Sequence, residues 1–182
     1  MANGTMTASR WWAWAIPARE EDWDALYAAE LPRVYNFFRY RVGPGAVAED
    51  LTSLTFEKAW SARHRYRRDL AAFSTWIFTI ARNVAVDHYR QQRPHLPLEA
   101  AADLAGGEGP ESLAERRSDE AHLARLLAGL GDRERELLSL KYGAGLTNRA
   151  IARLTGLSES NVGTILHRTI GGLRADWEKE KR

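Results

Sequence analysis

The stretch LTNRAIARLTGLSESNVGTILHRTIGGLR, residues 146–174, decides the fold of the C-terminal part of the chain. Its first half predicts a short helix carrying Ile151 and Ala152, and Gly156 follows at the position of a tight turn. Ser158 can cap the longer helix that comes next. One face of that longer helix is a continuous stripe, formed by Val162, Ile165, Leu166, Thr169, Ile170 and Leu173. This layout predicts a helix-turn-helix.

The opposite face of the longer helix carries hydrogen-bond donors and acceptors that suit a DNA groove. These residues are Ser160, Asn161, Thr164, His167 and Arg168. An ordinary helical hairpin is the alternative interpretation of the same spacing. The combination of turn, cap and polar face favours DNA binding over that alternative.

The chain upstream also reads as helices joined by turns. We expect a short helix over residues 22–30, a second helix that begins at Pro32, and a stop at the glycine-proline-glycine turn 43–45. The segment AVAEDLTSLTFEKAWSAR predicts another helix, with an apolar stripe formed by Val47, Leu51, Leu54, Thr55 and Ala59. Residues 64–72 then read as a basic loop.

The segment over residues 73–92 has the most regular helical period of the chain. Its apolar stripe consists of Phe73, Trp76, Ile77, Ile80, Ala81, Val84 and Ala85. Its other face carries Thr75, Thr79, Arg82, Asn83, Asp87 and Arg90. Aromatic and basic side chains together suit the stacking of unpaired bases and the binding of phosphates. The alternative is that Phe73 and Trp76 are simply core residues.

Composition and charge divide the 182 residues into four segments. Residues 1–22 form an N-terminal extension whose Trp11, Trp12 and Trp14 either belong to an unstructured tail or dock on a groove, and translation from Met6 is a further alternative. Residues 23–93 form a first helical domain, and residues 119–182 a second; basic residues outnumber acidic ones in both. Residues 94–118 are acidic and contain Pro94, Pro97 and Pro110, which predicts a flexible linker. The expected fold is therefore all-α, with two small helical domains.

Several function classes are excluded or disfavoured by the same sequence. The chain has no cysteine, and its five histidines are scattered without a metal-ligand spacing. No phosphate-binding glycine loop is present, so we expect no catalytic residues, no metal and no cofactor. Apolar runs are too short for a membrane span, and the expected location is the cytoplasm.

Three segments taken in order resemble the sigma-70 family of bacterial sigma factors, in the small extracytoplasmic-function (ECF) class. They are AEDLTSLTFEKAW, FSTWIFTIARNVAVDHYR and LTNRAIARLTGLSESNVGTILHRTIGGLR. The resemblance implies a region 2 domain and a region 4 domain. It implies a non-catalytic specificity subunit that binds core RNA polymerase, recognises and opens promoter DNA, and starts transcription.

The resemblance also implies roles for named residues. The core polymerase would be bound, at its β′ clamp helices, by Glu49, Asp50, Ser53, Leu54 and Phe56. The −10 promoter element would be bound by Arg65, Arg67, Arg68, Trp76, Arg82, Asn83, Asp87 and Arg90. The −35 element would be bound by Ser158, Ser160, Asn161, Thr164, His167 and Arg168.

The expected partners are core RNA polymerase, through its β′ clamp helices and β flap, and promoter DNA, with an anti-sigma factor as a further candidate and no membrane insertion. A competing hypothesis is a stand-alone helix-turn-helix regulator whose first half dimerises or senses a ligand. Such a dimer would bind palindromic DNA without polymerase. An enzyme is the third hypothesis, and no group of residues supports it.

Overall fold

The computed structural model describes residues 22–92, 119 and 121–180, and within them it contains helices and turns but no strand. The expectation of an all-α fold is therefore confirmed for this part of the chain. The predicted N-terminal extension and linker lie outside the described residues, apart from Asp22.

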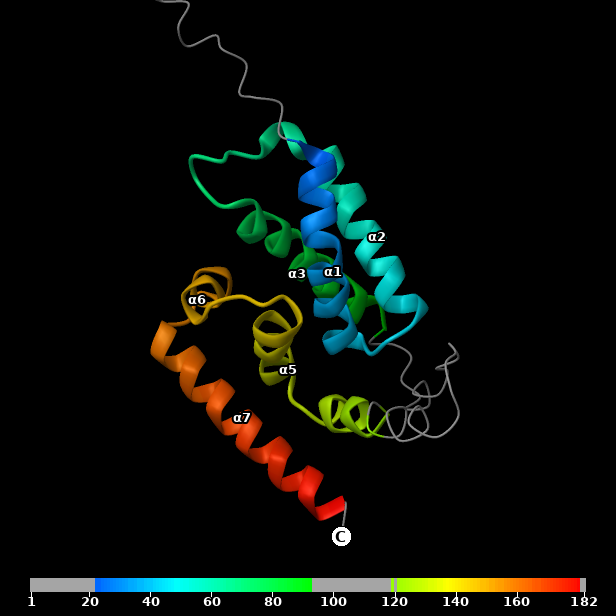
Figure 1. Ribbon diagram of the computed structural model, residues 1–182, viewed down its shortest axis with the longest axis vertical. Helices are drawn as coiled ribbons and strands as arrows, with labels where there is room; N and C mark the ends of the chain where they lie inside the picture. The colour runs from blue at the N-terminus through cyan, green and yellow to red at the C-terminus, as the bar shows by residue number, and fades with distance from the viewer. Residues whose placement is uncertain (1–21, 93–118, 120, 181–182) are drawn as a thin grey trace, which may run out of the picture.

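The first group of helices forms a small bundle (Figure 1). Helix α1 covers Trp23–Val42, α2 covers Ala46–Ser61, and α3 covers Phe73–Gln92. Asp22 caps α1 by accepting a 3.1 Å hydrogen bond from the Ala25 N–H. The turn predicted at residues 43–45 is confirmed, with positive φ angles of 92° at Gly43 and 110° at Gly45.

The predicted break at Pro32 is wrong, because α1 is one continuous helix with Pro32 inside it. Proline removes one backbone donor and usually breaks a helix interior. Here burial of the turn that follows Pro32 compensates, since Val34 and Phe37 are fully buried. Glu30 and Arg33 also bridge the proline with an ion pair at 2.8 Å.

The stripe predicted for α2 is partly wrong, since Val47 and Leu54 are 44% and 37% exposed. The buried face consists of smaller residues, namely Ala48, Leu51, Thr52, Thr55 and Ala59. The two threonine hydroxyls donate to backbone carbonyls one turn earlier, at 2.6 and 2.7 Å. Burial therefore leaves no unpaired hydroxyl, and the small side chains let α2 pack closely on α1 and α3.

The second group contains helical residues 121–128, α5 (Asp132–Leu138), the π-helical turn η2 (Ser139–Gly143), α6 (Asn148–Thr155) and α7 (Glu159–Glu180). Gly156 ends α6 in the left-handed region, with φ 74° and ψ 9°. The Asn161 N–H donates to the Ser158 hydroxyl at 3.2 Å. The predicted helix-turn-helix, including its turn and its cap, is confirmed.

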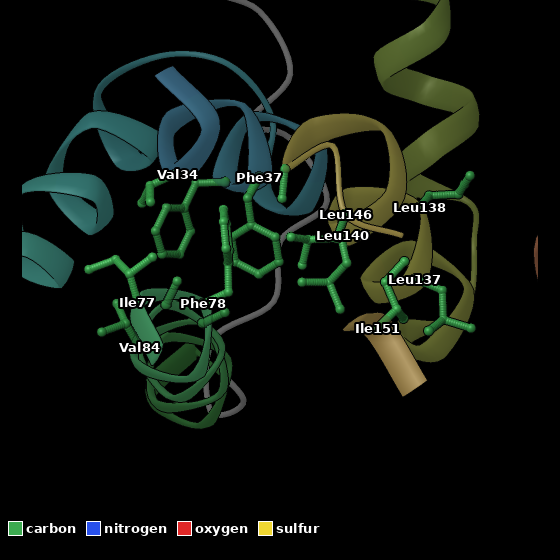
Figure 2. Packing of buried hydrophobic residues seen from close by; sticks show 14 of the residues in the cluster. Val34, Phe37, Ile77, Phe78, Val84, Leu137, Leu138, Leu140, Leu146 and Ile151 are labelled. Atoms are coloured by element: carbon green, nitrogen blue, oxygen red, sulfur yellow. The ribbon is translucent and has the colours of Figure 1, made fainter. Parts of the chain in front are cut away.

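The two groups share one hydrophobic core rather than standing apart. Helix α1 packs against η2, and α3 packs against α6. In Figure 2, Phe37 and Phe78 of the first group lie beside Leu140 and Leu146 of the second. The rings of Phe37 and Phe78 are 5.9 Å apart, and both residues are fully buried. Phe78 lies outside the predicted stripe of its helix because it serves this second contact.

Candidate nucleic-acid and protein interfaces

The outer face of α2 presents acidic and apolar side chains together. Glu49, Asp50, Ser53 and Leu54 are exposed. Phe56 is half-buried because its ring packs 4.6 Å from that of Tyr27, which is itself 46% exposed. A surface with exposed apolar groups beside carboxylates suits a protein partner that supplies apolar and basic contacts.

The segment between α2 and α3 is basic and exposed. It starts with a short 3₁₀ helix, Arg63–Arg65, and continues to α3 with Arg67 and Arg68 exposed. Arg67 donates two hydrogen bonds to Asp69, at 3.0 and 2.8 Å, which lowers the pKa of that carboxyl below its usual range. The bidentate pair gives the loop a fixed local shape but reduces its net positive charge.

An aromatic cluster lies beside this loop, at the start of α3. Trp76 packs against Tyr66, Phe73 and Trp23, with ring centres 5.2, 5.5 and 6.1 Å away. Trp76 and Tyr66 are half-buried, whereas Phe73 is 7% exposed. The alternative that Phe73 is a core residue therefore holds, while Trp76 keeps an accessible part.

Sequence reasoning missed most of this cluster. Trp23 also packs against Trp60, with ring centres 5.7 Å apart, and Arg63 lies 4.1 Å over the Trp60 ring. The sequence does carry one signal for this cluster. Aromatic residues stand at the start of α1, at the end of α2 and at the start of α3. An aromatic surface edged by arginines is suited to unpaired bases and their phosphates.

The polar face of α3 is only partly open. Three residues that follow Trp76 on the same helix are exposed along this face, namely Asn83, Asp87 and Arg90. Arg82 instead turns toward the second group, where its Nε lies 2.8 Å from Glu136 Oε1. The same guanidinium donates to the Leu154 carbonyl. Of the residues predicted on this face for DNA, Arg82 is therefore held by protein contacts in this conformation.

The helix-turn-helix presents its predicted polar face outward. Ser160, Asn161, Thr164, His167 and Arg168 are all exposed, while Val162 and Leu166 on the opposite side are buried. Thr147 caps α6 by accepting a 3.2 Å hydrogen bond from Ala150, so both helices of the motif start at a defined residue. The Ser158 hydroxyl accepts from the Asn161 N–H at this cap, and it lies 3.4 Å from the Ser160 hydroxyl, where either oxygen can be the donor.

The predicted residues thus fall into three surfaces: the outer face of α2, the basic loop with the start and polar face of α3, and the outer face of α7. Among the described residues, no three histidine, cysteine or acidic side chains lie together as metal ligands. Within the same part of the chain, no helix has the length and apolar character that crossing a bilayer requires.

Comparison with known families gives two matches in chain order. The descriptions are Sigma-70 region 2, over residues 26–95, and Sigma-70, region 4, over residues 121–170. Together they cover more than half of the chain.

Two similar proteins are both named ECF RNA polymerase sigma factors. The chain is 31% identical over 148 residues to the ECF RNA polymerase sigma factor BldN of Streptomyces coelicolor, covering 80% of this chain and 56% of that relative. It is 30% identical over 166 residues to the ECF RNA polymerase sigma factor RpoE of Cereibacter sphaeroides, covering 86% of this chain and 88% of the relative. The chain thus spans little more than half of the first relative but most of the second.

A solved structure shares the fold. The sigma factor RpoE from Bartonella quintana, in complex with the anti-sigma factor NepR, superposes with a TM-score of 0.67 at 21% identity. The match covers 85% of this chain and 95% of that one.

Proposed function

Because this chain belongs to the sigma-70 family of RNA polymerase sigma factors, in the ECF class, we propose that it is a dissociable specificity subunit of core RNA polymerase. It directs the enzyme to promoters, helps to open the DNA and starts transcription, without catalysing a reaction of its own. The presence of regions 2 and 4 in one chain carries this proposal. Such a subunit acts where the polymerase acts, in the cytoplasm.

The outer face of α2 is the proposed contact with the β′ clamp helices. Exposed Glu49 and Asp50 supply charge, and Ser53, Leu54 and Phe56 supply the neighbouring contact area. None of these five side chains lies in the core shared by the two groups of helices, although Phe56 packs against its edge. A partner can therefore contact this face without displacing a buried residue of that core. A second contact, between region 4 and the β flap, is part of the same proposal.

The basic loop and the aromatic start of α3 are the proposed −10 surface. Opening a duplex costs a few kcal/mol per unstacked step, so a region that melts DNA must bind the freed bases. Trp76 offers a stacking surface, and Arg65, Arg68 and Arg90 offer charge for the backbone. Asn83 and Asp87 supply hydrogen-bonding groups for base edges. Arg67 joins this set as a residue already paired with Asp69, and Arg82 joins it once it leaves Glu136.

The outer face of α7 is the proposed −35 reader. A helix of this kind enters the major groove with its N-terminal residues against base edges. Ser158, Ser160 and Asn161 lie at that end, with Thr164, His167 and Arg168 further along the same face. The family also makes an anti-sigma factor a candidate partner, as with the Bartonella quintana protein that was solved with NepR.

A pull-down against purified core RNA polymerase tests the proposed function. The tagged full chain should retain β and β′ in stoichiometric amounts and should release them when an excess of untagged chain is added. Failure to retain core enzyme, combined with binding of the chain alone to palindromic duplex DNA, would instead indicate a stand-alone regulator.

A further inference from the structure

Trp60, near the end of α2, is the most exposed tryptophan among the described residues, at 53%. Its indole meets the ring of Trp23 in a T-shaped contact, with ring centres 5.7 Å apart and an angle of 84° between the planes. Packing within the protein thus covers less than half of this residue. A large exposed indole is a strong contact group for a partner, because it offers apolar area together with a π-face.

Arg63 lies against the same ring. Its guanidinium carbon is 4.1 Å from the centre of the Trp60 ring, and its Nη1 donates a 2.9 Å hydrogen bond to the Trp60 carbonyl. The two contacts hold the cation over the indole, where it is attracted by the ring electrons. Arg63 is itself exposed, and a guanidinium carries five N–H donors. It can therefore bind an anion without leaving the ring.

The charge around Trp60 is positive on the side of the loop. Exposed Arg65 follows Arg63 in the short 3₁₀ helix that begins there. The acidic groups lie elsewhere, since Asp24 is at the start of α1 and Glu57 is one turn earlier on α2. A phosphate is attracted to the arginines and repelled by the carboxylates. The backbone of a bound nucleic acid would therefore lie on the loop side of the ring.

A row of three tryptophan rings joins this position to the proposed −10 surface. Trp23 contacts both Trp60 and Trp76, with ring centres 5.7 and 6.1 Å away. Figure 1 shows the start of α1 beside the end of α2, where the loop to α3 begins. The centres of Trp60 and Trp76 are thus at most about 12 Å apart, which a stacked single strand spans with about three nucleotides.

We propose that Trp60 and Arg63 form a second base-binding site for single-stranded DNA, next to the one at Trp76. An unpaired base stacks on the exposed part of the Trp60 indole, and Arg63 binds the neighbouring phosphate. This inference rests on the proposed function, because it takes Trp76 as a residue that binds the opened −10 element. The second site lengthens the single strand that region 2 retains and so stabilises the open complex. None of the five contacts proposed for core polymerase on α2 takes part in it.

Photochemical cross-linking of the holoenzyme tests where the base lies. 5-Iodouracil, which cross-links to aromatic side chains on irradiation, is placed at successive positions of both strands across the opened segment. A cross-link to Trp60, identified by mass spectrometry, is expected about three nucleotides from the positions that cross-link to Trp76. Absence of any cross-link to Trp60, while Trp76 is cross-linked, would overturn the second site.

The lifetime of the open complex is the second readout. Trp60→Ala should shorten it about tenfold, because a base stacked on an aromatic ring contributes a factor of that order. Trp60→Phe keeps a stacking ring and should retain most of the lifetime. Tyr142→Ala is the matched control, since Tyr142 is an aromatic residue of nearly equal exposure, 52%, on η2. Equal lifetimes for Trp60→Ala and the wild type would overturn the proposal.

An abasic nucleotide at the cross-linked position separates base stacking from a structural role of the ring. Without the base, the wild type and Trp60→Ala should give equal lifetimes. An equal loss for Trp60→Ala on abasic and on normal DNA would overturn the base site, and so would a loss of binding to core polymerase. If the wild-type holoenzyme formed no open complex on any promoter, the proposed function itself would fail.

Discussion

Arg82 Nε lies 2.8 Å from Glu136 Oε1 and so joins α3 of region 2 to α5 of region 4, between residues 54 positions apart. The side chains are only 24% and 20% exposed, so solvent screens this pair less than a surface ion pair. Replacing Arg82 would therefore change both the contact between the regions and any contact with DNA. Asn83, its exposed neighbour, is the cleaner probe of the −10 surface.

Asp50→Ala should weaken binding to core polymerase about fivefold, which corresponds to about 1 kcal/mol for one charged interface contact. Folding should be unaffected, because the side chain is exposed on the outer face of α2. The control is Glu178→Ala, an exposed acidic residue on α7 that is outside every proposed surface. A fluorescence titration with core enzyme measures both, and equal affinities for the two variants would contradict the α2 assignment.

Asn83→Ala should impair promoter opening while binding to core polymerase survives. The amide is exposed on the polar face of α3, which is part of the surface proposed to bind unpaired bases. Permanganate footprinting of holoenzyme on promoter DNA measures the reactivity of unpaired thymines. Wild-type reactivity in the variant would show that this face does not bind the melted strand.

Arg168→Ala should reduce transcription from promoters with an intact −35 element, at a cost of about 1–3 kcal/mol if the side chain reads a base. On a promoter whose −35 element is scrambled, wild type and variant should then give equal output. A similar loss on both promoters would instead assign Arg168 to the phosphate backbone. No loss on either would mean that α7 is not the −35 reader.

Phe37→Ala should lower the free energy of unfolding by about 3–5 kcal/mol, as for other large core aromatics. The ring is fully buried against Phe38 and Phe78, at 5.1 and 5.9 Å between ring centres. Tyr27→Ala, at a residue that is 46% exposed, should cost far less. Urea unfolding followed by circular dichroism compares them, and equal losses would contradict the shared core.

His88 predicts a pH dependence of stability, because burial lowers its pKa below the ordinary value of 6.5. Below that pH the unfolded chain binds more protons at this position than the folded chain, so acidification destabilises the fold. The stabilising contribution of neutral His88 is present above pH 6.5 and is lost as the pH falls through the lowered pKa. Urea unfolding at about pH 7.5 and 5.5 should show a smaller drop in stability for His88→Gln than for the wild type.

The sequence predicts the helices and the surface of the reader well, because both depend on local periods and caps. The stripe of α3, the left-handed turn at Gly156 and the Ser158 cap all follow from spacing within one segment. The same reasoning placed a break at Pro32, where burial of Val34 and Phe37 outweighs the lost hydrogen bond.

What the sequence did not predict depends on contacts between distant segments. Three features need both regions in place. They are the burial of Phe78, the ion pair between Arg82 and Glu136, and the close approach of Gly143 to the backbone of α1. The aromatic cluster likewise joins Trp23, Trp60 and Trp76 from three helices. No periodicity within one helix carries that information.

In vitro transcription with mapping of RNA 5′ ends tests the central claim most directly. Core RNA polymerase and genomic DNA are incubated with and without the full wild-type chain. We predict discrete start sites that appear only with the chain and share upstream elements near −10 and −35. Start sites that are identical with and without the chain would contradict its assignment as a promoter-specificity subunit.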